Sequence, residues 1–526
     1  MKIFYLLYLP VIVLLVSACK KNAVDENKQS TTLNNGSGGK TSPTSPTSAP
    51  RLINLKINGA SCAYDSLSVS YYYPVAVGTT LTGYTISFDT TTTAAVFINK
   101  VRIKNGGIVN TPLATNTKLT LTAVNNKITA TYNLIATGMP VVMLTAGAQI
   151  GDDDINATLD VIDPDYQSQH SKIETVSKIN ISLRGETSRY YPKSSFAIHT
   201  VDNANNATDV SFLGLRDDND WILDAMYIDQ SRMRNRLCTD IWNSFNNVPY
   251  IASEPTALNG TRGYMSEVFL NGKYNGIYCL TEKLDRKQLQ IKKQYGDMYK
   301  AKDWTDETDL QAVAPFDNNS DTWEGWELEY PDLGDSPAPD WTYLYNEINF
   351  IGTSSDADFI KQISAKVDLN NVVDYFIFMN ILEAWDNQNK NTYFSFYDIR
   401  TAPAFFYSPW DLDGTMGGDA AGGHETNALV EAGNNYLYQR LLKLNPNNFK
   451  DLLKQRWNSL KSSQLSKSVV AARIETYRSL LVNTNAFARE RLVWNNITQD
   501  LNPEASYMTT WYSAQYDLFD TYVNNL

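Results

Sequence analysis

The sequence is poor in the side chains that most often bind zinc or complete a catalytic triad. Its 526 residues include only three histidines and four cysteines. Isolated histidines argue against a multi-histidine zinc site or a Ser–His–Asp triad, and no cysteine pair has zinc-knuckle spacing. Beyond Cys19, only Cys62, Cys238 and Cys279 are present, so at most one bridge could form within the chain. A disulfide-built scaffold is therefore excluded.

The sequence also lacks an excess of positive charge. It has 45 Lys and Arg against 57 Asp and Glu, and a formal net charge of −12. Because nucleic-acid binding depends on Lys and Arg that neutralise phosphates, a general nucleic-acid binder is excluded and no nucleic-acid partner is expected. After the N-terminal segment, no apolar run is long enough to cross a bilayer.

The N-terminal segment MKIFYLLYLPVIVLLVSAC has the pattern of a secretory leader. Lys2 precedes an apolar run that is too short for a comfortable membrane span, and small residues then lead to Cys19. A cysteine in this place resembles a bacterial lipobox. We therefore predict that residues 1–19 are a lipoprotein signal peptide and that Cys19 is lipidated, which would anchor the protein to a membrane. The alternative is an ordinary signal peptide cleaved near Ala18.

Residues 20–50 predict a disordered tether. Ser, Thr, Gly, Pro and Asn dominate this stretch, and almost no apolar side chain is available for a core. A lipid anchor followed by a tether would hold the folded part away from a membrane, in the periplasm or at the cell surface.

Residues 51–526 are too many for one hydrophobic core, so at least two domains are expected. Residues 51–136 alternate apolar and polar side chains in short segments, which predicts a small all-β sandwich with an accessory role. In residues 137–526, strands are followed by one helix, a hairpin and then mainly helices, with two further strands. The predicted fold class is therefore α+β.

Local patterns place several elements in this second domain. A helix is predicted from about Asp229, a plausible N-cap, with an apolar face of Met233, Leu237, Ile241 and Phe245. SEVFLNGKYNGIYCLTEKLDR predicts a hairpin around an Asn-Gly turn. Residues 303–340 are acidic with Trp and Pro, and predict an irregular insertion. TYFSFYD and AFFYS predict two later strands.

Polar segments flank those two later strands. AWDNQNKN places Asp386 and Asn391, separated by four residues, before the first strand, and PWDLDG places Asp411 and Asp413 after the second. These side chains could converge at one end of the hairpin. Phosphoryl transfer needs an acid that takes the hydroxyl proton, plus an Asn and an Asp that hold a divalent metal on the phosphates. Protein kinases show this spacing, although a structural cation at the Asp411 turn is an alternative.

Candidate nucleotide-binding residues lie N-terminal to these polar segments. In LRGETSRYYPKSSFAI, a turn with Arg184, Ser188 and Arg189 could contact phosphates, and Lys193 then enters a strand. This order of loop and lysine is that of a kinase. Gly185 is the single glycine of the turn, so the turn is not a glycine-rich loop.

Five stretches in this order resemble the spore coat protein H (CotH) kinase-like family: RGETSRYYPKSSF, LGLRDDNDWILDAMYIDQSRMRNRL, EVFLNGKYNGIYCLTEKLDR, AWDNQNKN and FYSPWDLDGTMG. The resemblance covers roughly residues 138–460. It implies an atypical, two-lobed protein-kinase-like domain that uses ATP with Mg or Mn. It also implies that the partner is a protein substrate with Ser or Thr hydroxyls.

The resemblance implies roles for individual residues. Asp386 matches the catalytic Asp, and Lys193 the phosphate-binding lysine. Asp411 and Asn391 would be metal ligands, with Asp413 sharing or taking that role.

The same resemblance places Glu282, at the end of the hairpin, near the adenine contact. Trp410 and Tyr407 are candidates to stack on the base, and Arg184 and Arg189 are candidates to contact phosphates.

The sequence departs from a typical kinase in two ways. The helix predicted after Asp229 has no Glu to pair with Lys193, which leaves Glu267 and Asp240 as guesses for that partner. WDN and WDLDG stand in place of the HRD and DFG signatures.

Two other classes of function stay open. A kinase-like fold with weak or no activity could serve as a surface binding or assembly protein, and Asp386 and Asp411 facing apart would favour it. A glycosidase would use paired carboxylates, but it would leave Asn391 and Lys193 without a role.

Overall fold

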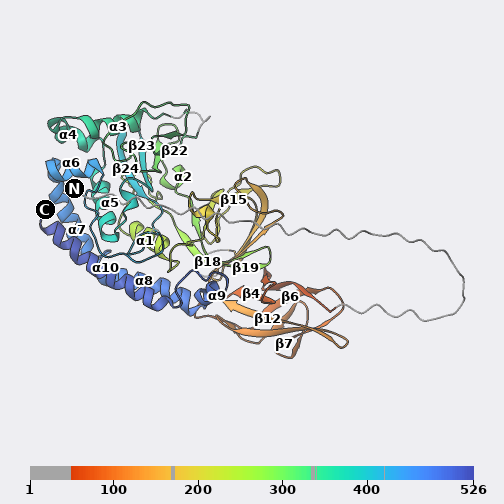
Figure 1. The fold of residues 1–526 in the computed structure, drawn as a ribbon. Coiled ribbons are helices and arrows are strands. Elements are labelled where there is room, and N and C mark those ends of the chain that lie inside the picture. Colours follow the sequence, from red (N-terminus) through yellow and green to blue (C-terminus); the bar gives the residue numbers. More distant parts are fainter. Residues whose placement is uncertain (1–48, 167–171, 333–337, 339, 420) are drawn as a thin grey trace, which may run out of the picture. The chain divides into compact units, whose positions relative to one another are not determined.

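The computed structural model describes residues 49–166, 172–332, 338, 340–419 and 421–526. The predicted signal peptide with Cys19, and most of the predicted tether, lie outside the described residues. Residues 49–526 form one compact unit (Figure 1). None of the helices described in this unit combines the length and the apolar character needed to cross a membrane.

The N-terminal region is rich in β-structure, as predicted. One sheet has the strand order β2-β1-β6-β9 and a second has the order β3-β4-β12-β11-β7-β8, while β10 pairs with β5. Burial alternates along several strands, as expected of half-buried strands. The strands are β1 (Leu52–Ile57), β2 (Ala60–Ser61), β3 (Ala63–Asp65), β4 (Ser70–Pro74), β5 (Thr80–Leu81), β6 (Tyr84–Thr90), β7 (Ala95–Ile98), β8 (Val101–Ile103), β9 (Gly107–Val109), β10 (Leu113–Ala114), β11 (Lys118–Asn125) and β12 (Ile128–Thr137).

The next seven strands form a closed barrel in the order β13-β14-β15-β16-β17-β19-β18. They are β13 (Val141–Ala146), β14 (Ile155–Ile162), β15 (Glu174–Arg184), β16 (Ser195–Val201), β17 (Asp220–Asp224), β18 (Gly263–Leu270) and β19 (Lys273–Glu282). The predicted hairpin is confirmed as β18–β19. Its turn residues Asn271 and Gly272 have φ values of 49° and 69°, the left-handed conformation that favours Asn-Gly in a tight hairpin.

The barrel and the N-terminal β-rich region share a hydrophobic core. Val141, Ile162, Phe269 and Tyr274 of the barrel pack in the same cluster as the N-terminal strands. In addition, the backbone N–H of Tyr274 donates to the carboxylate of Asp65 at 3.2 Å. Residues 51–136 are thus packed directly against the barrel.

The predicted helix after Asp229 forms as α1 (Arg234–Asn243), and it begins several residues later than expected. The Asp229 carboxylate still reaches its first turn, because it accepts hydrogen bonds from the backbone N–H of Met233 and of Arg234, each at 2.7 Å. The predicted apolar face is buried as a set: Met233, Leu237, Ile241 and Phe245.

A five-stranded sheet follows the barrel and is called the second sheet from here on. Its strand order is β21-β22-β20-β23-β24. Its strands are β20 (Asp297–Ala301), β21 (Thr322–Trp323), β22 (Trp326–Tyr330), β23 (Thr392–Asp398) and β24 (Ala402–Pro409). The hairpin β23–β24 was predicted. The description of residues 303–340 as wholly irregular was wrong, because β21 and β22 lie in this stretch. In β22, the buried Trp326, Leu328 and Tyr330 alternate with the half-buried Glu327 and Glu329, a period-two pattern present in the sequence.

After residue 340 the chain is mainly helical, as expected. α5 is buried along almost its whole length, and α9 packs against β19 of the barrel (Figure 1). The helices are α2 (Arg286–Leu289), α3 (Thr342–Thr353), α4 (Asp356–Gln362), α5 (Leu369–Leu382), α6 (Tyr436–Leu444), α7 (Phe449–Lys461), α8 (Lys467–Asn483), α9 (Ala486–Val493) and α10 (Leu501–Asn524). Short 3-10 turns lie at η1 (Ser188–Tyr190), η2 (Ile363–Ala365), η3 (Asp386–Gln388) and η4 (Pro446–Asn448).

Candidate functional site

A cavity of about 480 Å³ is lined by residues of the barrel, of α1 and of the five-stranded sheet with its flanking loops. Most of the residues singled out from the sequence line this one cavity, although they come from distant segments. They are Arg184, Arg189, Lys193, Asp386, Asn391, Trp410, Asp411 and Asp413. The predicted convergence of the two polar segments around β23–β24 is therefore observed.

Asn387 holds these two polar segments together. Its buried side-chain amide donates to the carbonyl oxygens of Asn391 and Trp410, each at 2.7 Å. The backbone N–H of Trp410 also donates to the Asn391 carbonyl at 2.9 Å. The loop that carries Asp386 is thus joined directly to the loop that carries Asp411. Nothing in the segment AWDNQNKN distinguishes Asn387 from its polar neighbours.

Two of the candidate metal ligands adopt an unusual backbone conformation. Asn391 and Asp411 have φ values of 53° and 56°. This left-handed region costs most residues roughly 1–2 kcal/mol, and Asn and Asp tolerate it best after Gly. Such conformations concentrate at binding and catalytic sites.

The acidic side chains in the cavity disfavour one another's ionisation. Burial raises the pKa of Asp411 above its usual range, the charge of Asp224 raises it further, and Arg184 and Lys300 oppose the shift. Burial also raises the pKa of Asp413 well above its usual range, and the charge of Asp411 adds to that effect. Asp411 nevertheless stays open to solvent in the cavity.

These groups fit a divalent cation. Carboxylate and amide oxygens are the ligands that Mg²⁺ and Mn²⁺ prefer. A cation would also relieve the repulsion that raises the pKa values of Asp411 and Asp413. The cavity therefore has a suitable donor set from Asp411, Asp413 and Asn391.

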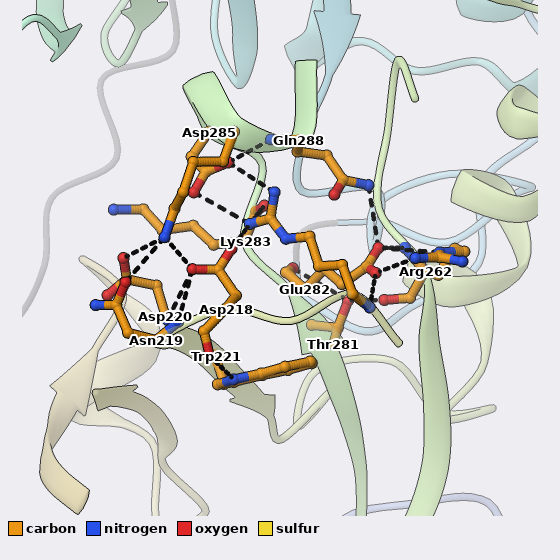
Figure 2. A network of polar contacts seen from close by, with 12 residues as sticks. Asp218, Asn219, Asp220, Trp221, Arg262, Thr281, Glu282, Lys283, Asp285 and Gln288 are labelled. Carbon is orange, nitrogen blue, oxygen red and sulfur yellow. Dashed lines mark hydrogen bonds and ion pairs between the residues drawn. The ribbon is translucent and has the colours of Figure 1, made fainter. Parts of the chain in front are cut away.

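A more compact carboxylate group lies outside the residues that line the cavity. Asp218, Asp220 and Asp285 have oxygens within 4.8 Å of one another, the one group of this kind in the described part of the chain (Figure 2). Protein cations already neutralise it. Arg216 pairs with Asp218 and Asp285, Lys287 pairs with Asp218, and His199 lies 2.6 Å from Asp220. This group is best explained as an ion-pair network.

Lys193 lies just before β16 and is buried. Its Nζ donates to the backbone carbonyl of Ile277 and to Glu490 Oε1, the latter at 2.8 Å, and it lies 4.5 Å from the Tyr278 ring centroid. Burial lowers its pKa from 10.5 to about 8, and the Glu490 charge limits that decrease. Lys193 is therefore charged at neutral pH.

Glu490 on α9 is the acidic partner of Lys193, and sequence reasoning missed it. Its Oε1 also accepts from Arg232 Nε at 2.8 Å, and its Oε2 accepts from the backbone N–H of Ile277 at 2.6 Å. Both guesses for this partner were wrong. Glu267 instead pairs with Arg489, and Asp240 pairs with Arg236.

One feature of the sequence could have pointed to this contact. Gly276 has a φ of 101°, and a Cβ there would lie 2.1 Å from Glu490 Oε2. The glycine of the segment KYNGIY therefore makes room for the carboxylate.

Glu282, expected near the adenine contact, is not among the residues that line the cavity. Its buried carboxylate accepts from Arg262 Nη2 at 2.7 Å, from the Arg216 backbone N–H at 3.1 Å and from Gln288 Nε2 at 3.0 Å (Figure 2). The side chain thus ties the end of β19 to the following turn. Tyr407 is also unsuited to stack on a ligand, because it is fully buried and stacks on Tyr375 at 4.6 Å.

The two arginines differ in their surroundings. Arg184, at the end of β15, has its guanidinium carbon 5.6 Å from the Trp410 ring centroid. Arg189 Nε donates to the Gly185 carbonyl at 2.7 Å, and its Nη1 lies 3.4 Å from Asp152. Arg184 thus lies beside the aromatic side chain that was expected to stack on a base, whereas Arg189 holds the turn.

The structure adds cavity residues that had no predicted role. They include Asp224 of β17, Asn235 of α1, and Lys300 and Lys302 at and just beyond the end of β20. Lys302 forms an ion pair with Glu186 at 3.4 Å, which links the turn after β15 to the second sheet.

Comparison with known proteins gives one family. A family model described as CotH kinase protein matches residues 181–519. No curated protein matches the chain. A crystal structure described as a "putative glycoside hydrolase" from Bacteroides thetaiotaomicron has 9% identity and a TM-score of 0.15, over 50% of this chain and 65% of that chain. A TM-score this low carries no argument about fold or activity.

Proposed function

The chain belongs to the CotH kinase protein family, and from this premise we propose that it is an atypical protein kinase. It transfers the terminal phosphate of ATP to Ser or Thr hydroxyls of a protein, with Mg²⁺ or Mn²⁺. The observation that carries this proposal is the single cavity lined by Lys193, Asp386, Asn391, Asp411 and Asp413.

The roles of these residues follow from their chemistry. Asp386 accepts the proton of the substrate hydroxyl while the hydroxyl oxygen bonds to the terminal phosphorus and the bond to the ADP oxygen breaks. Lys193, held by Glu490, contributes a fixed positive charge toward the phosphates. Asp411, Asp413 and Asn391 would hold the divalent metal, which supplies further stabilisation of phosphate charge.

Anchoring is a second part of the proposal and is supported by the sequence alone. Lipidated Cys19 would attach the protein to a membrane, and residues 20–50 would hold the folded unit at the periplasmic face or the cell surface. Metabolic labelling with a radioactive fatty acid should mark the wild-type protein and fail to mark Cys19→Ser.

ATP binding is the first test. Calorimetry would use a chain that lacks residues 1–19, with ATP and either MgCl₂ or MnCl₂. We expect metal-dependent binding by the wild type and by Asp386→Asn, and binding weaker by about tenfold or more in Asp411→Asn. Transfer of labelled terminal phosphate to an acceptor protein should then fail in Asp386→Asn, by about a hundredfold or more.

Absence of ATP binding by the wild type with either metal would contradict the proposal. It would favour the alternative, a kinase-like fold that serves as a surface binding or assembly protein. That alternative was expected to show Asp386 and Asp411 facing apart, whereas both line the same cavity. A glycosidase would give no role to Lys193 and Asn391, which line it as well.

A further inference from the structure

Asp224 is a third carboxylate beside the two aspartates of the PWDLDG segment. It is the last residue of β17, so it belongs to the barrel, whereas Asp411 and Asp413 follow β24 of the second sheet. All three line the cavity. Asp224 Oδ1 accepts from the backbone N–H of Met226 at 3.1 Å and from Ser195 Oγ at 3.4 Å. Its carboxylate is thus oriented by the barrel.

Asn235 of α1 connects this carboxylate to the opposite loop. Its Nδ2 donates to Asp224 Oδ2 at 2.8 Å, and its Oδ1 accepts from the backbone N–H of Leu412 at 3.2 Å. Leu412 lies between Asp411 and Asp413. One amide side chain therefore sets the spacing between the barrel carboxylate and both aspartates of the loop.

The charges of the three carboxylates act on one another. Asn235 bonds both to Asp224 and to the backbone between Asp411 and Asp413, so all three negative charges are held in the same part of the cavity. Like charges held close together repel one another, and a bound cation relieves that repulsion. Lys193, a buried cation that lines the same cavity, is already paired with Glu490. Lys300, which also lines the cavity, lies 4.0 Å from Glu327 and 3.9 Å from Glu329. The three-carboxylate wall therefore favours an added cation.

We propose that Asp224 is a further protein ligand of the divalent metal, together with Asp411 and Asp413, and that Asn235 positions the Asp224 carboxylate. The inference rests on the proposed function of the cavity but concerns the metal alone. Within the described residues, these carboxylates do not form a group as compact as Asp218, Asp220 and Asp285. The wider spacing suits Mg²⁺, which keeps several waters, better than an ion enclosed by protein oxygens.

A metal held in this way joins two parts of the fold. Asp224 comes from the barrel and the aspartates of the loop come from the second sheet, so one ion would restrain both walls of the cavity. A metal with ligands only on the Asn391 and Asp411 loops would restrain only the loops that flank β23 and β24.

The test is a titration with Mn²⁺ in the absence of nucleotide. Electron paramagnetic resonance measures the concentration of free Mn²⁺ at each step. Asp224→Asn and Asp413→Asn should each bind Mn²⁺ at least about tenfold more weakly than the wild type, and Asn235→Ala should weaken binding by about tenfold. Glu186→Gln is the matched control, because it removes one negative charge from the cavity wall at an exposed residue paired with Lys302. It should stay within about twofold of the wild type.

Two results would overturn the inference. In the first, Asp224→Asn binds Mn²⁺ as tightly as Glu186→Gln does, while Asp413→Asn binds Mn²⁺ weakly. The other is a wild type that binds no Mn²⁺ at millimolar concentration. Neither result decides the transfer activity, which the ATP assays test separately, so the two failures can be distinguished.

A measurement on the wild type covers the case in which Asp224→Asn fails to fold. Fe²⁺ in place of Mn²⁺, with ascorbate and peroxide, cleaves the backbone beside the ion. We expect fragments that end near Asp224 as well as near Asp411 and Asp413. Cleavage confined to the segments around Asn391 and Asp411 would overturn the inference.

Discussion

Lys193 Nζ lies 2.8 Å from Glu490 Oε1, and neither side chain is exposed to solvent. The same carboxylate oxygen accepts from Arg232 Nε at 2.8 Å. One buried anion thus serves two buried cations, and α9 of the C-terminal region supplies it to the barrel. The Lys–Glu pair expected of a kinase is present, but its acid comes from a helix far along the chain.

Replacement of Glu490 by Gln should strongly destabilise the fold. It leaves Lys193 and Arg232 buried without a counter-charge, and breaking a buried pair in this way typically costs about 3–5 kcal/mol. Urea unfolding measures the change. Glu475→Gln is the control, because Glu475 is exposed at the surface and its pair with Arg478 should contribute less than about 1 kcal/mol. Equal losses in the two variants would contradict the role given to Glu490.

The pH dependence of nucleotide affinity should report on Lys193. Its pKa in the folded protein is lowered from 10.5 to about 8. The positive charge is therefore present at pH 7 and is lost as the pH rises through about 8, so ATP affinity should fall between pH 7 and pH 9. Calorimetry at fixed metal concentration measures this. In Lys193→Arg the decrease should be absent, because arginine keeps its charge.

The free energy of unfolding should rise with pH as Lys193 loses its proton, whereas ATP affinity falls. Between about pH 8 and pH 10.5 the unfolded chain holds the Lys193 proton and the folded chain does not. Stability from this group therefore rises with pH in that window. The difference in unfolding free energy between the wild type and Lys193→Met, measured across this pH range, isolates the contribution of Lys193. A difference that falls with pH would contradict the lowered pKa.

The parts of the site that could be predicted are close in sequence or follow a regular pattern. Asp386, Asn391 and Asp411 flank one hairpin, so their convergence follows from the pairing of β23 with β24. The α1 face and the Asn-Gly turn follow from periodicity and turn chemistry.

The remaining parts depend on contacts between distant segments. Glu490 is separated from Lys193 by 297 positions, and nothing in its neighbourhood on α9 distinguishes it from other surface-type glutamates. Asp224 ends an apolar strand, where a polar residue usually marks only the strand's end. Both acquire a role because α9 and α1 pack beside the barrel, and single-sequence patterns do not specify that packing.

Asp413→Asn should stabilise the metal-free protein and remove its response to metal. The pKa of Asp413 is raised, so the folded state disfavours the ionised form and loses stability as the pH rises above the usual carboxyl range of about 4. The penalty therefore grows from about pH 4 upward and is larger at pH 7 than at pH 5. In EDTA, the variant should melt at a higher temperature than the wild type, whereas Mn²⁺ should raise the melting temperature of the wild type alone.

The same pair of proteins provides the control. At lower pH the Asp413 carboxyl is protonated in the folded wild type, so the advantage of the variant in EDTA should shrink. A variant that melts below the wild type in EDTA at pH 7 would show that the side chain stabilises the fold without metal.

Gly276→Ala should disrupt the Lys193–Glu490 pair without changing either of its two side chains. The new Cβ would lie 2.1 Å from Glu490 Oε2, at a φ of 101° that side chains rarely adopt, so the carboxylate must move away from Lys193 and Ile277. We expect a loss of about 3 kcal/mol or more in urea unfolding, together with weaker ATP binding. Gly272→Ala is the matched control, since its φ is 69° and its nearest contact is 3.8 Å, which leaves only a backbone cost of roughly 1–2 kcal/mol. If both variants lose the same stability and keep the same ATP affinity, the Glu490 carboxylate does not position Lys193.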